Sequence, residues 1–204
     1  VYRTARNARE AGIPYIYKKT DSALRGNIGS ELTAVMDAAG SDTIAFLPAF
    51  PKMGRVTRNG VHYVDGVPVA ESVFGKDPFE PVKASAVAQI VGGQTEVPVV
   101  LHRLDEAAVP GAPGIQVYDA TTDEDLARIG GELGTERLRL SAGCAGFATA
   151  LADVLGLNGT EPQMPQLPSA FFVACGSVNP VTLRQMRWAE QNGFVHIHLE
   201  PLQK

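Results

Sequence analysis

The sequence predicts a layered α/β fold with a mostly parallel sheet and an inserted β-hairpin. Short apolar runs typical of buried strands alternate with longer segments that repeat apolar residues at helical spacing. Strands joined by helices pair in parallel, because the helix carries the chain back to the starting edge of the sheet. The hairpin is predicted separately, from Asp65-Gly66 between two strand-like segments, 61–64 and 67–70.

The N-terminal part of the chain contains two predicted helices and two predicted strands. The first helix carries apolar residues at helical spacing from the start of the chain and ends at Gly12. A second, amphipathic helix is predicted over 28–39, and Gly40 ends it. The two strands are predicted over 14–18 and 43–47.

A change of composition follows the second strand. Residues 48–60, PAFPKMGRVTRNG, are rich in proline, glycine and basic residues, and this pattern predicts a long loop. The predicted hairpin comes next, and a helix is predicted over 82–91. The hairpin is therefore an antiparallel addition to a sheet that is otherwise parallel.

The C-terminal half repeats the alternation of strands and helices. Thr122 and Asp125 have the spacing of a capping box and predict a helix start. Asn179 followed by Pro180 predicts another helix start, and this helix runs to about Gly193. The remaining predicted segments are a helix over 144–155, a proline-rich linker over 157–168, and strands over 97–101, 115–119, 137–140, 170–175 and 194–199.

Composition excludes several classes of protein. The 204 residues suffice for one domain with a full core, and a net charge of −4 argues against a nucleic-acid binder that relies on positive charge. Two cysteines are too few for a disulfide framework, and no apolar stretch approaches the ~20 residues that span a bilayer. No secretory leader opens the chain, so we expect a soluble cytoplasmic protein without nucleic-acid or membrane partners.

Each end of the sequence lies in or just after a predicted element. Val1 already belongs to the pattern of the first helix, and the last residues directly follow a predicted strand. We therefore expect 1–204 to be a single α/β domain that is a fragment of a larger protein. A homo-oligomer is compatible with this prediction.

Basic residues are concentrated in the N-terminal part of the chain. Residues 1–58 hold nine Lys and Arg against five Asp and Glu, whereas residues 59–204 hold nine against seventeen. Part of the excess lies in two loop-like segments, 18–27 and 52–58. Such segments often surround an anionic ligand, although charge alone slightly favours a solvated basic face.

The segment KKTDSALRGNIGSEL follows a predicted strand and precedes a predicted helix, where open α/β sheets bind ligands. Its glycines permit close approach to the backbone, and the helix N-terminus offers N–H groups to an anion. Alternatively, Asp21 and Ser22 are turn residues and Arg25 pairs with Glu31. The density of polar residues favours a binding site, in which arginine clamps a carboxylate and serine and asparagine bind hydroxyls. The candidates are Lys19, Asp21, Ser22, Arg25 and Asn27.

The same segment resembles the K-x-D-S-T-L-R-G-N-x-G-x-E-L signature of the four-carbon acid sugar kinase family. FLPAFPKMGRVTRNGVHYVDGVPVAES resembles the family's P-A-F-P-x-x-G-R-x-T-x-x-G-x-H-Y-V-x-G block. VYDATTDEDLARI and ACGSVNPVTLRQM resemble two later blocks, so that the resemblance spans roughly residues 15–190. Ala23 stands where the family usually has threonine.

The resemblance implies a Rossmann-like domain that binds a sugar acid of the erythronate, threonate or 3-oxo-tetronate type. In this family the γ-phosphoryl group of ATP moves to the terminal hydroxyl, so ATP and Mg²⁺ are the implied cofactors. The N-terminal domain holds the sugar acid, and we expect the C-terminal domain, which holds most of the nucleotide, to be absent here. Arg55, Asn59 and His62 become further substrate-binding candidates, and a position inside the hairpin explains His62 equally well.

Gly176 and Ser177 are the nucleotide-binding candidates, because the resemblance places a phosphate contact at this helix N-terminus. An ordinary turn capped by Asn179 also explains them. No catalytic base and no metal ligand is predicted. The alternative function is a non-catalytic sugar-acid binding or regulatory module. A nicotinamide-dependent dehydrogenase is disfavoured, because no G-x-G-x-x-G follows a strand.

Overall fold

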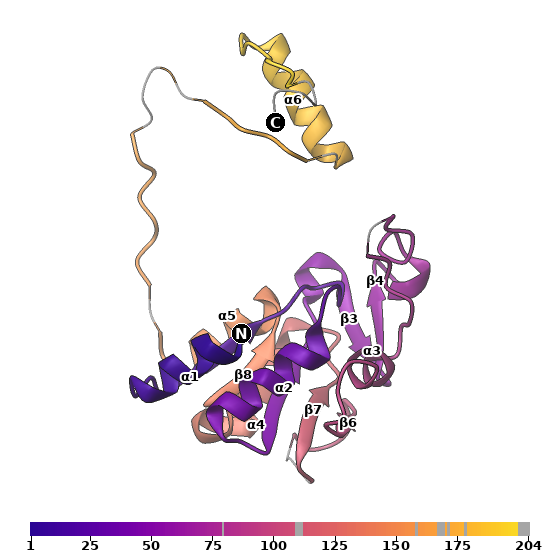
Figure 1. Ribbon diagram of the computed structural model, residues 1–204, viewed down its shortest axis with the longest axis vertical. Coiled ribbons are helices and arrows are strands. Elements are labelled where there is room, and N and C mark those ends of the chain that lie inside the picture. The colour runs from indigo at the N-terminus through magenta and orange to yellow at the C-terminus, as the bar shows by residue number, and fades with distance from the viewer. Residues whose placement is uncertain are drawn as a thin grey trace. The chain divides into compact units, whose positions relative to one another are not determined.

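The structure is a computed structural model, which describes residues 1–78, 80–108, 112–157, 159–166, 170, 172–177 and 179–199. The chain divides into two compact units, Val1–Gly159 and Thr160–Lys204, and each is described by itself (Figure 1). Within the described part of the chain, every helix is too short or too polar to cross a lipid bilayer.

A five-stranded parallel sheet organises the first unit. Its strands lie in the order β1-β8-β2-β7-β6, and each neighbouring pair is parallel. This arrangement confirms the predicted α/β fold with a mostly parallel sheet. The strands are β1 (Ile16–Lys19), β2 (Thr43–Leu47), β6 (Val99–His102), β7 (Gly114–Tyr118) and β8 (Leu140–Gly143).

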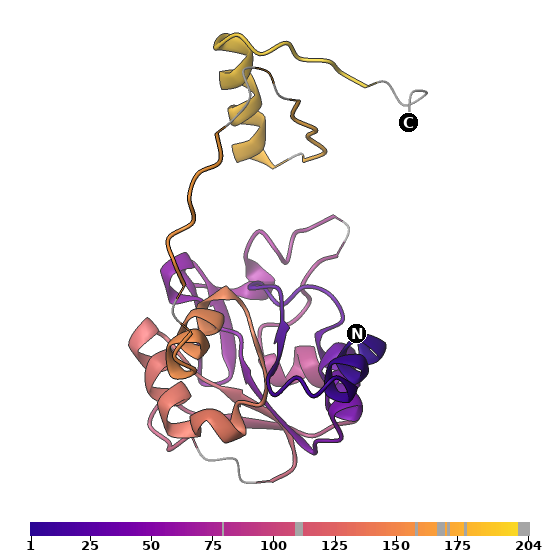
Figure 2. The same ribbon diagram turned by 90° about the vertical axis from the view of Figure 1, so that its left-hand side faces the viewer.

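Helices cover both faces of this sheet, and Figure 2 separates the indigo and purple helices on one side from the orange helices on the other. Alternate residues of β2 point to opposite faces. Ile44 and Phe46 pack in one apolar cluster with α2 and α3, whereas Ala45 and Leu47 pack in another with α4 and α5. The helices are α1 (Tyr2–Glu10), α2 (Ile28–Ala39), α3 (Val87–Gly92), α4 (Asp123–Arg137) and α5 (Ala145–Val154).

A separate antiparallel sheet has the order β3-β4-β5. Its strands are β3 (Arg55–Arg58), β4 (Val61–Val64) and β5 (Val67–Pro68), and the short 3₁₀ helices η1 (Pro51–Met53) and η2 (Val69–Glu71) flank it. The hairpin at Asp65-Gly66 is confirmed, but the prediction that 48–60 is a loop is wrong, because β3 pairs with β4.

Two tight turns with left-handed backbone join these three strands. Asn59 and Gly60 have φ of 53° and 71°, and Asp65 and Gly66 have φ of 50° and 79°. A pair of positive φ angles suits the right-handed twist of a two-residue hairpin, and Asn-Gly and Asp-Gly are the residue pairs that adopt it most readily. Both turns are therefore encoded locally.

Most predicted element boundaries are close to those of the structure. The helix over 28–39 and the strand over 43–47 are confirmed, as is the capping box of Thr122 with Asp125 at the start of α4. The helix predicted over 82–91 begins only at Val87. The strand predicted over 137–140 begins at Leu140, because α4 continues to Arg137.

The second unit contains helix α6 (Pro180–Gln191). Its predicted start is confirmed, since the Asn179 side-chain oxygen accepts the Val181 N–H at 2.8 Å and Pro180 is the first helical residue. The strands predicted over 170–175 and 194–199 are wrong, because the described residues of these segments form no strand and are exposed. A strand needs ladder partners for its backbone N–H and C=O groups, and the described residues of 170–175 and 194–199 form no such ladder.

Replacing Gly29 by alanine tests how the start of α2 contacts α3. A Cβ at Gly29 comes within 2.2 Å of the Val91 carbonyl oxygen and 2.9 Å of the Gln94 Cβ. Because the first of these is a backbone atom, we expect Gly29→Ala to lower the free energy of unfolding by about 1–3 kcal/mol, measured by urea denaturation.

Gly131→Ala in α4 is the matched control. A Cβ at Gly131 meets nothing within 4 Å. Alanine in a helix interior should therefore raise the free energy of unfolding by roughly 0.5–1 kcal/mol. Equal changes in the two variants would contradict the close packing of α2 on α3.

Candidate functional site

The carboxyl ends of the parallel strands place polar residues at one edge of the sheet. Lys19 ends β1 and lies two residues before Asp21, while Asp119 directly follows β7. The antiparallel sheet is attached to the same edge, because Thr57 of β3 and Ala120 exchange backbone hydrogen bonds of 2.9 and 3.0 Å. This edge is where open α/β sheets bind ligands.

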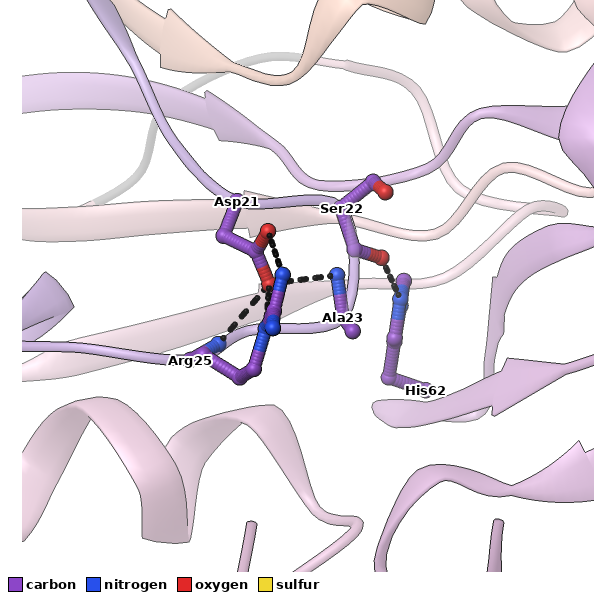
Figure 3. A network of polar contacts seen from close by, with 5 residues as sticks. All are labelled: Asp21, Ser22, Ala23, Arg25 and His62. Atoms are coloured by element: carbon purple, nitrogen blue, oxygen red, sulfur yellow. Dashed lines mark hydrogen bonds and ion pairs between the residues drawn. The ribbon is translucent and has the colours of Figure 1, made fainter. Parts of the chain in front are cut away.

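Asp21 organises the turn between β1 and α2 (Figure 3). Its Oδ2 accepts hydrogen bonds from the backbone N–H groups of Ala23 at 3.1 Å and Arg25 at 3.3 Å. The guanidinium of Arg25 also donates to both carboxylate oxygens, with Nε–Oδ2 at 3.0 Å and Nη2–Oδ1 at 2.9 Å. Arg25 therefore pairs with Asp21 and not with Glu31, which pairs with Lys18 at 2.7 Å.

These contacts determine the charge state of the pair. Burial opposes ionisation of Asp21, but hydrogen bonds from the side chain and backbone of Arg25 outweigh it and hold the pKa of Asp21 below its ordinary value. The hydrogen bond to Asp21 raises the pKa of Arg25. A carboxylate has about four acceptor positions. Asp21 accepts four hydrogen bonds here, so its role in this structure is to hold Arg25 and the turn.

The turn contains strained backbone. Leu24 has φ of 61°, which is uncommon for a residue other than glycine, and Gly26 has φ of 87°. Ala23 and Leu24 are 1% and 2% exposed and belong to two different apolar clusters. Burial of these side chains, together with the hydrogen bonds to Asp21, offsets the cost of the left-handed conformation.

His62 lies in the interior between the hairpin and this turn. The residue is 0% exposed, and its Nδ1 lies 3.0 Å from the Thr57 hydroxyl while its Nε2 lies 2.9 Å from the Ser22 carbonyl oxygen. Burial lowers the pKa of His62 to about 4. The predicted substrate-binding residue is thus a neutral imidazole with both ring nitrogens engaged.

Arg25 and Arg55 meet at the ring of Phe74. Their Cζ atoms lie 5.1 and 5.9 Å from its centroid, within the range of cation–π attraction. Arg55 Nη1 also donates a hydrogen bond to the Met53 carbonyl oxygen and lies 3.9 Å from Oδ1 of Asp65. Among the described residues, nothing accepts a hydrogen bond from its buried Nε. The hairpin and the turn therefore bring two predicted cationic candidates together.

The remaining candidates of this unit lie around the same turn and hairpin. Lys19 is exposed at the end of β1, and Asn27 is exposed at the start of α2, where its side chain makes no capping hydrogen bond. Ser22 is partly buried, and its hydroxyl points away from His62 (Figure 3). Asn59 is exposed in the β3–β4 turn.

Asp119 is a buried acid that sequence reasoning did not select. It is 3% exposed, and its Oδ1 accepts the Gly60 N–H at 3.0 Å. Burial raises the pKa of Asp119, although backbone hydrogen bonds from Gly60 and Asn59 oppose the shift. Asp119 thus ties the Asn59-Gly60 turn to the end of β7. The Asn59-Gly60 pair is a sequence signal for the turn but does not indicate its contact with Asp119.

Gly176 and Ser177 belong to the second unit and precede α6. Both are exposed, and the Ser177 Oγ accepts the Asn179 N–H at 3.2 Å. A Cβ at Gly176 meets nothing within 4 Å, so the backbone there is open to approach. Among the described residues, no group of three or more His, Cys, Asp or Glu side chains is arranged to hold a metal ion.

A hollow of about 670 Å³ lies at the opposite, amino edge of the parallel sheet, lined by residues that include Arg9, Tyr118 and Arg137. Arg9 lies in the last turn of α1, where a cation interacts favourably with the helix dipole, and its Nη1 donates to the Ala38 carbonyl oxygen at 3.3 Å. These interactions account for Arg9 without a ligand. The carboxyl edge, with its strained turn and paired arginines, is therefore the stronger candidate site.

Residues 1–151 match the family model of a sugar-binding N-terminal domain. The chain is 36% identical over 186 residues to a D-threonate kinase of Salmonella typhimurium, covering 85% of this chain and 42% of the relative. It is 30% identical over 191 residues to a 3-oxo-tetronate kinase of Methylobacterium radiotolerans, covering 83% of this chain and 44% of the relative. The chain spans less than half the length of these curated relatives.

The fold is also similar to solved structures. A domain of unknown function from Bordetella bronchiseptica, crystallised with bound citrate as a domain-swapped dimer, aligns with a TM-score of 0.65 and 34% identity. The alignment covers 76% of this chain and 39% of that one.

Protonation of His62 should destabilise the protein in a defined pH range. The folded protein lowers the pKa of His62 from 6.5 to about 4, so the unfolded chain binds this proton more readily. The contribution of neutral His62 to the free energy of unfolding is complete above pH ~6.5 and is lost as the pH falls toward ~4. This loss amounts to on the order of 3 kcal/mol. Urea unfolding between these pH values measures the loss.

His62→Gln provides the control, because glutamine does not titrate. The difference in unfolding free energy between this variant and the unmodified protein should shrink as the pH falls from 6.5 toward 4. Arg55 and Asp21 act on the ring in opposite directions, the first lowering and the second raising the pKa of His62. A difference that stays constant across the range would show that the folded imidazole has an ordinary pKa.

Proposed function

This chain belongs to the four-carbon acid sugar kinase family, and from this premise we propose that its first unit binds a four-carbon sugar acid for phosphorylation by ATP. The proposal rests on the carboxyl edge of the parallel sheet. A sugar acid of this size carries one carboxylate and several hydroxyl groups. Recognition therefore requires cations with a defined geometry beside side chains that bind hydroxyls.

The observation that carries the proposal is the pairing of Arg25 with a carboxylate. The Arg25 guanidinium donates to both oxygens of Asp21 through Nε and Nη2, so Asp21 would hold it in one orientation in which Nη1 donates to a substrate carboxylate. Arg55 lies against the same Phe74 ring, and the Arg55 Nε is buried with no acceptor among the described residues. The citrate in the Bordetella bronchiseptica structure, itself a hydroxylated carboxylate, supports this ligand class.

The proposed roles follow from exposure and hydrogen bonding. Arg25, Arg55 and Lys19 would bind the carboxylate, and Ser22, Asn27 and Asn59 would bind hydroxyls. Asp21 would orient Arg25, because its acceptor positions are filled by the turn. Holding the sugar acid in one orientation accounts for a large part of phosphoryl-transfer catalysis, since the reaction depends on positioning and charge stabilisation.

ATP would supply the phosphoryl group. Gly176 and Ser177 are the residues of this chain that would contact its phosphates, because they precede the N-terminus of α6 and the backbone there is open. Mg²⁺ is bound in many kinases by substrate phosphates and one or two carboxylates, so the described residues need not form a complete cage for it.

Replacing Arg25 tests the sugar-acid site. We expect Arg25→Ala to weaken binding of D-threonate to this chain by about tenfold to a hundredfold, because a charge-assisted hydrogen bond is lost. Threitol, which has no carboxylate, should not bind measurably to either protein. Titration calorimetry measures both ligands. Arg6→Ala is the control, since Arg6 is an exposed residue of α1 that pairs with Glu10.

Equal affinities of the Arg25 and Arg6 variants would exclude Arg25 from the site. A second assay distinguishes a kinase from a non-catalytic binding module. ADP formation by the full-length protein is measured with D-threonate, D-erythronate and a 3-oxo-tetronate. Sugar-acid-dependent ADP formation supports the kinase, whereas binding without ADP formation supports the module.

A further inference from the structure

A buried chain of hydrogen bonds connects the end of β7 to the turn between β1 and α2. Ala120 pairs with Thr57 through two backbone hydrogen bonds. The Thr57 hydroxyl contacts the His62 Nδ1 at 3.0 Å, and the His62 Nε2 contacts the Ser22 carbonyl oxygen at 2.9 Å. His62 and Ser22 are 40 residues apart in sequence, so this link joins two parts of the chain that are distant in sequence.

The partners of the imidazole specify its tautomer. A backbone carbonyl can only accept a hydrogen bond, so the His62 Nε2 must carry the proton and donate it to Ser22. The Nδ1 is then an acceptor, and the Thr57 hydroxyl donates to it. A neutral imidazole with the proton on Nε2 satisfies both contacts, whereas an imidazolium would leave a second donor facing Thr57.

The position of His62 excludes direct contact with a ligand. The residue is 0% exposed, and each of its ring nitrogens already has a partner. Its backbone N–H also donates to the Ser85 carbonyl at 2.8 Å. Any effect of His62 on the site must therefore pass through the groups that it holds.

The group held by Nε2 is the peptide that precedes the strained part of the turn. Ser22 lies two residues before Leu24, whose φ is 61°. Asp21 fixes the same turn from the other side by accepting the N–H groups of Ala23 and Arg25 (Figure 3). Strained backbone of this kind persists only where the surroundings determine it fully, and it is often found at functional sites.

We propose that His62 is a positioning residue: through its Nε2–H it holds the Ser22 carbonyl and so fixes the turn that presents the Ser22 hydroxyl and the Arg25 guanidinium to the ligand. This inference rests on the proposed function, in which the same turn binds a sugar acid. The hairpin then serves as a rigid support for the turn. His62 acts through the turn and does not contact the substrate itself.

Two substitutions separate this role from a general contribution to the core. In His62→Gln the side-chain amide can reach the position of the imidazole Nε2 and still donate to the Ser22 carbonyl. In His62→Asn the shorter amide can occupy the position of Nδ1 near Thr57 but cannot reach Ser22. Both variants remove the ring and leave polar side chains of similar chemistry, so each is the matched control of the other.

The test measures D-threonate affinity by titration calorimetry and stability by urea unfolding at pH 7.5. We expect His62→Asn to bind D-threonate at least about tenfold more weakly than His62→Gln. Equal affinities would overturn the positioning role, as would a tenfold difference that vanished under conditions in which the two variants were equally folded. Failure of the unmodified chain to bind D-threonate would instead count against the proposed function.

A spectroscopic measurement on the unmodified protein needs no folded variant. Nitrogen-15 NMR of the histidine rings reports which nitrogen carries the proton. We expect the proton of His62 on Nε2 at pH 7.5, with no change of tautomer when D-threonate saturates the site. A proton on Nδ1, a charged ring, or a change of tautomer on ligand binding would contradict the proposal.

Discussion

Buried hydrogen bonds that join the antiparallel hairpin to the carboxyl edge of the parallel sheet keep the candidate site in place. Thr57 pairs with Ala120, and Asp119 accepts the N–H of the Asn59-Gly60 turn. His62 of the hairpin then contacts the β1–α2 turn through the Ser22 carbonyl oxygen. Leaving a buried polar group without a partner lowers the free energy of unfolding by about 1–3 kcal/mol. Separating the hairpin from the turn is therefore unfavourable. This constraint supplies the fixed geometry that the proposed binding of a sugar acid requires.

The parts of the fold that follow from local patterns could be predicted from the sequence. The helix over 28–39 has amphipathic spacing and a terminal glycine, and the Asp65-Gly66 turn is specified by two residues. Strand β3 was missed because Arg55, Thr57 and Arg58 make it mostly polar, and its pairing with β4 is not visible in the sequence. The Asn59-Gly60 pair carries the same turn signal as Asp65-Gly66 and could have revealed the strand.

The segment that contains the candidate site could be predicted from the sequence. The contacts between its side chains could not. The density of polar residues from Lys19 to Asn27 marks the turn, yet the spacing of Arg25 allowed either Asp21 or Glu31 as its partner. The folded turn, in which Leu24 has a φ of 61°, pairs Arg25 with Asp21, and the sequence does not specify this backbone conformation. The contact of His62 with Ser22 depends on the assembled fold and leaves no local pattern in the sequence.

The proposed binding place of the sugar acid is the carboxyl edge, between the β1–α2 turn and the β3–β4 hairpin. Titration of the nitrogen-15-labelled chain with D-threonate, followed by amide NMR, tests it most directly. We expect the shifted amides to lie in residues 19–27 and 55–62. Shifts confined to the amino edge, around Arg9, Tyr118 and Arg137, would contradict it and place the ligand in the hollow at the other end of the sheet.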